Sequence, residues 1–429
     1  MTRRIWPLGL AAIALAAVSW TARAGAAPAE PPRQPEPAPS SSVAGWQEFV
    51  DTLRTLPDRM LARLPEPMRG DPQVQQEVAR VALEALASQT LDAIGGDGDV
   101  PQFMPSIGQV LNVGQPNADT VYRSANLTPG GSYRLRGRRG NVSLAILQQV
   151  LPPTDPNRGA AAQLDLATLK VDKDGRYDVL VSPTRPASYT GDWWELKPTA
   201  TRLMLRMVSA DWDHEVEPTI SIERVDKPAG RPRPSAALLE QRLRALPHQI
   251  DFIAQLFVDH VEKLRQQGVV NQLKVFNPPF SILKGQFYYE GVYDLKDDEA
   301  LIIETNIPVK CDYRSLILTN ELYETTDWYN NHSSLNGAQA APDADGRLRI
   351  VVSAKDPGAK NWLDTAGYPS GIIQGRWTGC DAEPIPTVQK VKVADVLKVL
   401  PKGVATVTPA QRQEIIRERR RILQQRPLW

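Results

Sequence analysis

Apolar residues with helical spacing mark the start of the part of the chain that is expected to fold. Apolar residues recur every three to four positions and so form one stripe along a helix. They are Trp46, Phe49, Val50, Leu53, Leu56, Met60 and Leu61. A second helix has a cap in Asp71, a proline at Pro72 and a stop at Gly95-Gly96, which are the signals that helix ends favour. Residues 43–96 are therefore predicted to form a small helical subdomain.

Short β-rich runs separated by turn residues fill two further segments, 97–234 and 270–400. Strands at this spacing predict antiparallel β-sandwiches of Greek-key or jelly-roll type. Lys173-Asp174-Gly175 is expected to be the turn of a hairpin between residues 166–171 and 177–181, because Asp-Gly supplies the positive φ of tight turns.

Two further helices complete the predicted elements. Residues 235–269 read as a helical connector that begins at Ser235, bends at Pro247 and ends at Gly268. Within 401–429, Thr408-Pro409-Ala410-Gln411 forms a capping box that opens an amphipathic helix. Its apolar side is expected to pack on the body and its basic side to face solvent or an anionic envelope surface; the two sides are Ile415, Ile416, Ile422 and Leu423, and Arg412, Arg417, Arg419 and Arg420.

The two β-rich segments repeat one pattern. In the first copy, residues 171–182, with an Asp-Gly-Arg turn, are followed by Asp192-Trp193-Trp194 and Arg206. The second copy comes about 170 residues later and has the same order: 343–353, Asn361-Trp362-Leu363 and Arg376. A fixed period indicates duplicated domains. The predicted fold is thus multidomain α+β, with two related sandwiches joined by the helical connector. The repeated Arg and Trp are expected to stack as a cation–π pair that holds each sandwich together.

The N-terminus resembles an export signal. Arg3 and Arg4 precede an apolar run at 5–19, and small residues follow at 24–26, which predicts a signal peptide over 1–26 and a periplasmic mature protein. Residues 27–42, rich in proline, alanine and serine, are expected to be a flexible linker, and no later segment is long and apolar enough for a transmembrane helix.

Composition excludes several functional classes. The formal net charge of +1 gives no electrostatic attraction for nucleic acid. The four histidines show no short-spaced pair, and the nucleotide-binding and serine-hydrolase motifs are missing, so no metal and no cofactor are predicted. Cys311 and Cys380 could form a disulfide in an oxidising compartment or remain free thiols.

The second repeat contains a polar cluster that the first repeat lacks. Histidine can titrate, and asparagine and glutamine can orient a polar ligand, although the same residues are common in turns. The candidate ligand-binding residues are Asn331, His332, Asn336, Gln339, Trp362 and Arg376.

Candidate acid–base residues lie in both repeats. Asp119 and Tyr122 could act as an acid–base pair, or they could fix the entry into a strand through local hydrogen bonds. His332 could act together with Asp356 and Asp364, two carboxylates near an aromatic platform.

Two of these motifs resemble a family of bacterial proteins with tandem domains of unknown function. Asn117-x-Asp119-Thr120-x-Tyr122 resembles the signature of domain of unknown function 1254. Asp356-Pro357-Gly358-x-x-Asn361-Trp362-Leu363-Asp364, followed by Gly371 and Arg376-Trp377, resembles that of domain 1214. The resemblance implies a secreted protein with a helical N-terminal part and two β domains, and it supplies no reaction.

The sequence favours a periplasmic protein that binds a small or oligomeric ligand through its tandem β domains. A cofactor-independent hydrolase or lyase and a structural envelope protein are the alternatives. An enzyme would need acid–base groups that converge in one pocket, and a binding protein would need a groove lined by aromatic residues. A scaffold would need neither.

Overall fold

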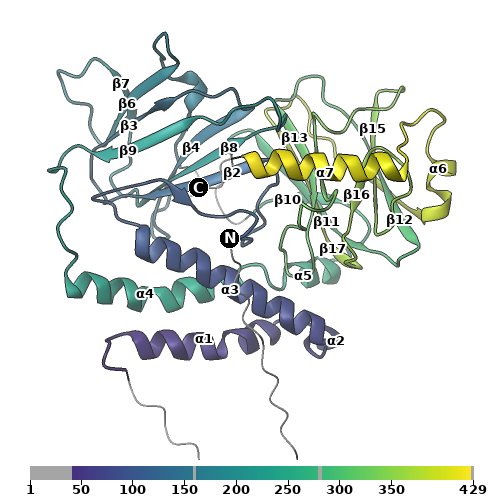
Figure 1. The fold of residues 1–429 in the computed structure, drawn as a ribbon, viewed down its shortest axis with the longest axis horizontal. Helices are drawn as coiled ribbons and strands as arrows, with labels where there is room; N and C mark the ends of the chain where they lie inside the picture. Colours follow the sequence, from purple (N-terminus) through teal and green to yellow (C-terminus); the bar gives the residue numbers. More distant parts are fainter. Residues whose placement is uncertain (1–40, 158–160, 279–282, 427–429) are drawn as a thin grey trace, which may run out of the picture. The chain divides into compact units, whose positions relative to one another are not determined.

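The computed structural model describes residues 41–157, 161–278 and 283–426, and its helices and strands are drawn in Figure 1. The predicted signal peptide and nearly all of the predicted linker lie outside the described residues. The elements below belong to one compact unit, Val43–Trp429. No described helix combines the length and apolarity that crossing a bilayer requires.

Helices from two distant parts of the chain share one core. Their bounds are α1 (Trp46–Leu61), α2 (Glu66–Arg69), α3 (Pro72–Gly95) and α4 (Ala236–Gln255). Helix α5 (His260–Gln266) follows α4 and packs in a separate cluster with Val292 and Ile372 of the second half. The caps are as predicted, because Asp71 accepts from the Gln73 amide at 2.8 Å and Ser235 from the Leu238 amide at 3.2 Å. The predicted connector is two helices and not one, and α4 packs with α1 and α3 around buried Leu56, Val78, Leu246 and Ile250.

The first β-rich half has two sheets. A five-stranded sheet has the order β1-β2-β8-β4-β5 and a four-stranded sheet the order β7-β6-β3-β9. The bounds are β1 (Met104–Pro105), β2 (Thr120–Asn126), β3 (Tyr133–Arg138), β4 (Leu144–Val150), β5 (Gln163–Asp165), β6 (Arg176–Ser182), β7 (Asp192–Glu195), β8 (Arg202–Val208) and β9 (Thr219–Arg224). Apolar residues of both sheets, such as Leu135 and Leu205, form one core.

The second half repeats this topology strand for strand, with orders β10-β11-β17-β13-β14 and β16-β15-β12-β18. The bounds are β10 (Lys274–Phe276), β11 (Gln286–Asp294), β12 (Glu299–Asn306), β13 (Tyr313–Leu318), β14 (Ser334–Asn336), β15 (Arg347–Ser353), β16 (Trp362–Asp364), β17 (Ser370–Thr378) and β18 (Thr387–Lys392). Each half has one parallel pair, β6 with β7 and β15 with β16, among otherwise antiparallel pairs. The predicted multidomain α+β fold with two related sandwiches is confirmed.

The predicted hairpin at Gly175 is wrong. Gly175 has the expected positive φ of 73°, but Leu166–Thr168 forms a 3₁₀ turn, and β6 pairs with β3 and β7. The Asp-Gly turn therefore joins a loop to β6, and β6 pairs with strands other than the segment that precedes the turn.

The predicted Arg–Trp stack is also wrong. Each repeated tryptophan donates its indole N–H to a serine one strand away, Trp193 to Ser182 and Trp362 to Ser353, both at 3.0 Å. The cation over Trp362 is Arg412, at 5.0 Å from the ring centre. The repeated tryptophans therefore support the fold without the repeated arginines.

The C-terminal helix α7 (Pro409–Gln425) begins at the predicted capping box but buries part of its basic side. Arg412, Arg419 and Arg426, seven residues apart, are buried. Arg412 pairs with Asp356 of the second half at 2.8 Å, and Arg426 pairs with Glu217 of the first half at 2.8 Å. The expectation of a fully solvated basic side is wrong for Arg412 and Arg419, because α7 spans both halves through these contacts. The short α6 (Val396–Val399) precedes it.

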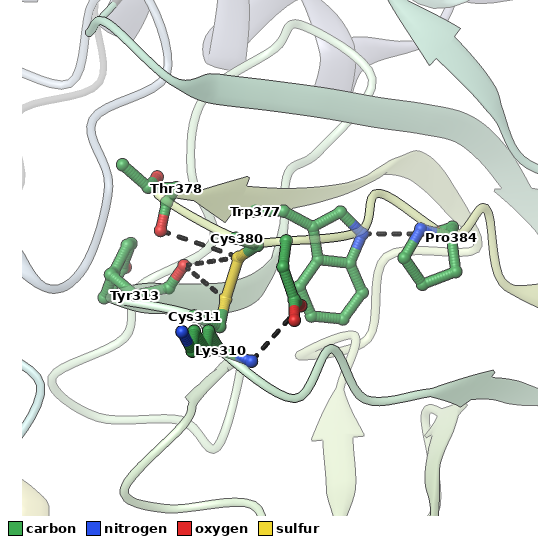
Figure 2. Close-up of a disulfide and its surroundings, with 8 residues drawn as sticks. Lys310, Cys311, Tyr313, Trp377, Thr378, Cys380 and Pro384 are labelled. Atoms are coloured by element: carbon green, nitrogen blue, oxygen red, sulfur yellow. Dashed lines mark hydrogen bonds between the residues drawn. A yellow bond between two sulfur atoms is a disulfide. The ribbon is translucent and has the colours of Figure 1, made fainter.

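Cys311 and Cys380 form a disulfide in the second half (Figure 2). Cys311 lies just before β13 and Cys380 just after β17, two strands that pair with each other. The neighbouring Trp377 donates its indole N–H to the carbonyl of Pro384 at 2.9 Å. Of the two alternatives left open by the sequence, the structure therefore contains the bridge.

A buried carboxyl on α3 predicts a dependence of stability on pH. Burial and the neighbouring carboxylate of Glu324 raise the pKa of Glu84 from 4.5 to about 8. Because this folded-state pKa exceeds the unfolded one, the stabilisation is complete below pH 4.5 and is lost as the pH rises towards 8. Glu84→Gln mimics the protonated form, so its melting temperature should exceed that of the wild type at pH 8.5 and match it near pH 5. Glu77→Gln, on the same helix, is the control, and an equal difference at both pH values would contradict the prediction.

Candidate functional site

A buried carboxylate joins the two halves. Asp119, only 1% exposed at the start of β2, accepts hydrogen bonds from the Trp212 indole and the Asn336 amide, each at 2.7 Å, and from the Tyr313 hydroxyl. Trp212 belongs to the first half, whereas Asn336 and Tyr313 belong to the second. Burial raises the pKa of Asp119, and the three hydrogen bonds oppose this rise. The carboxylate therefore connects elements that are far apart in the sequence.

The rest of the Asn117–Tyr122 motif supports the same junction. The Asn117 side-chain amide donates to the Tyr313 hydroxyl at 2.8 Å, and its backbone N–H donates to the Tyr122 hydroxyl at 3.1 Å. The Asp119 amide approaches the Asn117 side-chain oxygen at 3.5 Å. These contacts resemble the predicted strand entry fixed by local hydrogen bonds; an acid–base role for Asp119 or Tyr122 stays a prediction.

Two arginines occupy equivalent positions on the central strands of the five-stranded sheets. Arg206 on β8 lies opposite Tyr122, and Arg376 on β17 lies opposite Tyr288. Their strand neighbours, Leu205 and Trp377, belong to the sandwich cores, so the arginine side chains lie on the outer sheet faces.

The outer faces of the two sheets interact electrostatically across the junction. Arg206 interacts with Tyr288 of the second half, and Arg376 with Tyr122 of the first half. Burial raises the pKa of Tyr288 and lowers that of Arg206, yet both side chains keep part of their surface accessible. The two arginines therefore lie near one shared region between the halves.

Neither guanidinium forms a direct ion pair among the described residues, although the Asp119 carboxylate acts on Arg376 from a longer distance and raises its pKa. Arg206 donates to the side-chain oxygen of Gln148, and Arg376 donates to that of Gln374 at 2.8 Å. An amide oxygen carries no charge that could neutralise a buried cation, and buried cations are costly without an anion. Four buried polar atoms on the outer face of the second half have no hydrogen-bond partner among the described residues: Arg376 Nε, Ser315 Oγ, Thr378 Oγ1 and Glu290 Oε2.

The polar cluster predicted from the second repeat divides between the junction and local turns. Asn336 binds Asp119 as described above, and the side-chain oxygen of Gln339 accepts from the Asn336 backbone N–H at 3.2 Å. Asn331 donates to the carbonyl of Asp327 at 3.0 Å and so closes a turn.

His332 and the paired carboxylates lie together near α7. The His332 ring is buried, stacks on Trp362 at 6.2 Å and hydrogen-bonds the Trp362 carbonyl through Nδ1. Burial and two nearby arginines hold its pKa well below the ordinary range, so the ring is neutral. Asp364 donates its amide to the His332 carbonyl at 2.9 Å, and Asp356 is held by Arg412. Arg412 lies near all three acid–base candidates, but the described residues show no hydrogen bond between the His332 ring and either carboxylate, and a catalytic role for them stays a prediction.

Several residues of the junction were not predicted from the sequence. They all lie on strands: Tyr288, Tyr313, Gln148 and Gln374. Alternation of apolar and polar residues shows which face of a strand is in the core, but it does not show whether the polar face packs against another part of the protein or faces water. The signal that could have found them is the repeat itself, because each repeated arginine has a tyrosine opposite it. No group of three or more metal-ligating side chains that could hold an ion occurs in the described ranges.

Comparison with known proteins finds a partial match to one sequence family and no function. The model of the family described as "Protein of unknown function (DUF1214)" matches residues 119–211 and 297–370. Both β-rich halves thus contain a region that is similar to the DUF1214 family. This match supports a tandem DUF1214 family, and the presence of a domain 1254 module in the first half stays a prediction. No curated protein matches the chain.

Solved structures similar to this chain include one that is described as uncharacterised. An uncharacterised protein from Burkholderia cenocepacia is 27% identical, with a TM-score of 0.74, over 82% of this chain and 98% of that one. A protein from Vibrio parahaemolyticus is 12% identical, with a TM-score of 0.40, over 74% of this chain and 99% of that one. The protein from Burkholderia cenocepacia therefore has a similar fold over nearly its whole length.

Proposed function

We propose that this protein binds a small organic anion between the outer faces of its two five-stranded sheets. The observation that carries the proposal is the pair Arg206 and Arg376, which are equivalent in the two halves and form no direct ion pair among the described residues. A carboxylate or phosphate group would supply the missing charge, and it fits the planar donor arrangement of guanidinium.

The neighbouring groups support binding rather than simple burial. Orphaned hydroxyls of Ser315 and Thr378 lie on the same sheet face as Arg376, and buried polar groups without partners are costly in a folded protein. The Tyr288 ring lies under Arg376, 5.2 Å from the guanidinium carbon, and so orients it. A ligand with acceptor atoms would bind to the arginine and to these hydroxyls together.

Binding is testable with a thermal-shift screen of organic acids against their neutral amides. An acid present at about a hundred times its Kd should stabilise the protein by about 2.7 kcal/mol, whereas the matched amide should not. Arg206→Gln and Arg376→Gln should each weaken binding about ten- to hundredfold, because each removes a charge-assisted hydrogen bond. Arg136→Gln, at an exposed position of β3, is the control. Equal shifts by acids and amides, or unchanged affinity in both variants, would contradict the proposal.

We propose in addition that the mature protein acts in the periplasm after export. The signal-like segment 1–26 supports this, and so does the disulfide between Cys311 and Cys380, since such bridges persist in oxidising compartments. Contact of α7 with an envelope surface would fall to Arg417 and Arg420, the exposed basic residues of the predicted basic side.

A further inference from the structure

A buried glutamate lies on the same sheet face as the proposed arginine site. Glu290 on β11 is 0% exposed and lies two residues from Tyr288, so both side chains are on the outer face of the sheet. One carboxylate oxygen contacts His260 Nε2 at 2.8 Å. The other oxygen, Oε2, has no hydrogen-bond partner among the described residues.

Strand register places this free oxygen within reach of the arginine site. Glu290 lies opposite Gln374, and Arg376 follows two residues later on the same strand. Such diagonal neighbours are about 7–8 Å apart across a pair of strands. The guanidinium of Arg376 already contacts the Gln374 side chain at 2.8 Å. One small molecule can therefore contact both the arginine and the glutamate.

Aromatic rings hold Glu290 in place on the side of α5. The His260 ring packs against Tyr323 at 4.9 Å and Phe276 at 5.4 Å, and Phe276 packs against Tyr288 at 6.2 Å. Tyr323 accepts a hydrogen bond from Gln374 at 3.1 Å. The His260–Glu290 pair is thus held by packing on the sheet face that carries Arg376.

We propose that the ligand is a carboxylic acid that carries a hydroxyl or protonated amino group next to its carboxylate. The carboxylate would bind Arg206 and Arg376, and the hydroxyl or amino group would donate to Glu290 Oε2. An ionised carboxylate oxygen can only accept hydrogen bonds. A ligand that carries a hydrogen-bond donor therefore gives Glu290 Oε2 a partner, whereas a ligand without a donor leaves this oxygen unpaired. This ligand class depends on the proposed function, because it adds a second contact to the same site.

Matched sets of acids test this class. Propionate, lactate and alanine form a small set, and 3-phenylpropionate, 3-phenyllactate and phenylalanine form an aromatic one. Calorimetric titration of the whole protein should show that a donor-bearing acid binds about ten- to hundredfold more tightly than its parent acid.

Substitution of Glu290 should remove this preference. Glu290→Met keeps the side-chain length but has no carboxylate, so parent and donor-bearing acids should bind it equally. Glu290→Gln, which keeps the shape and loses the charge, serves if the methionine variant does not fold, and it should lose the preference for the amino acid. Glu223→Gln, at an exposed position of β9, should keep the preference.

The outcomes separate this class from the proposed function. If acids bind through Arg206 and Arg376 but no donor-bearing acid binds more tightly than its parent, the ligand class is wrong and the anion site stands. A preference that persists in Glu290→Met would also overturn the role of Glu290. If no acid of the wider screen binds at all, the proposed function itself fails.

Discussion

Replacing Asp119 by alanine is expected to lower the free energy of unfolding by about 3–5 kcal/mol. The substitution leaves the Trp212 indole, the Asn336 amide and the Tyr313 hydroxyl without their acceptor in a buried junction. Each buried donor that loses its partner costs about 1–3 kcal/mol, and removal of one member of a buried polar network is costly as a whole. Urea unfolding followed by tryptophan fluorescence measures the change.

Two further variants make the Asp119 result specific. Asp119→Asn keeps one acceptor oxygen and the shape of the side chain, so it should cost less than the alanine variant. Asp174→Ala, at an exposed turn of the first half, should change the unfolding free energy by less than about 0.5 kcal/mol. A cost below about 1 kcal/mol for Asp119→Ala would show that the halves are held together by other contacts, such as those of α7.

Local sequence signals predicted the ends of helices and the duplication. Asp71, Ser235 and Thr408 act within one turn of their own helices, so their effect does not depend on distant residues. The repeat predicted two equivalent sandwiches, since duplicated sequences share a topology, and the strand orders of the two halves correspond throughout.

Long-range pairing was the part that sequence patterns could not determine. Gly175 forms its turn, but the partner of β6 is β3, some forty residues earlier. Arg412 and Arg419 were expected in solvent because a charge pattern does not reveal the groups opposite it. In the structure Asp356 neutralises Arg412, and Trp212 lies 4.7 Å from the Arg419 guanidinium.

Under the proposed function, a repeated feature of the fold would also contact the ligand. Arg206 and Arg376 were visible in the sequence and were interpreted as partners of the repeated tryptophans, because shared residues usually support the shared fold. The sequence could not show that the outer faces of the two five-stranded sheets lie near each other, where both arginines meet tyrosines of the opposite half. The cluster at 331–339 was predicted as the site, and of it Asn336 and Gln339 reach the junction.

Removing the disulfide should be about as destabilising as removing Asp119. The bridge closes a loop of 69 residues, and a loop of this length restricts the unfolded chain by about 4 kcal/mol. Cys311→Ser with Cys380→Ser should therefore lower the unfolding free energy by about that amount in urea under non-reducing conditions. The double variant avoids the free thiol that a single substitution would leave.

Reduction of the wild-type protein provides the matched experiment. Dithiothreitol should lower the stability of the wild type to that of the double serine variant and should leave the variant unchanged. If the variant loses less than about 1 kcal/mol, the bridge does not stabilise the protein through the unfolded chain as expected, because residual contacts between β13 and β17 already restrict this loop there. Because Tyr313 lies two residues from Cys311 and donates to Asp119, we further expect the bridge and the Asp119 network to be coupled. The triple variant should then lose less stability than the sum of the two separate changes.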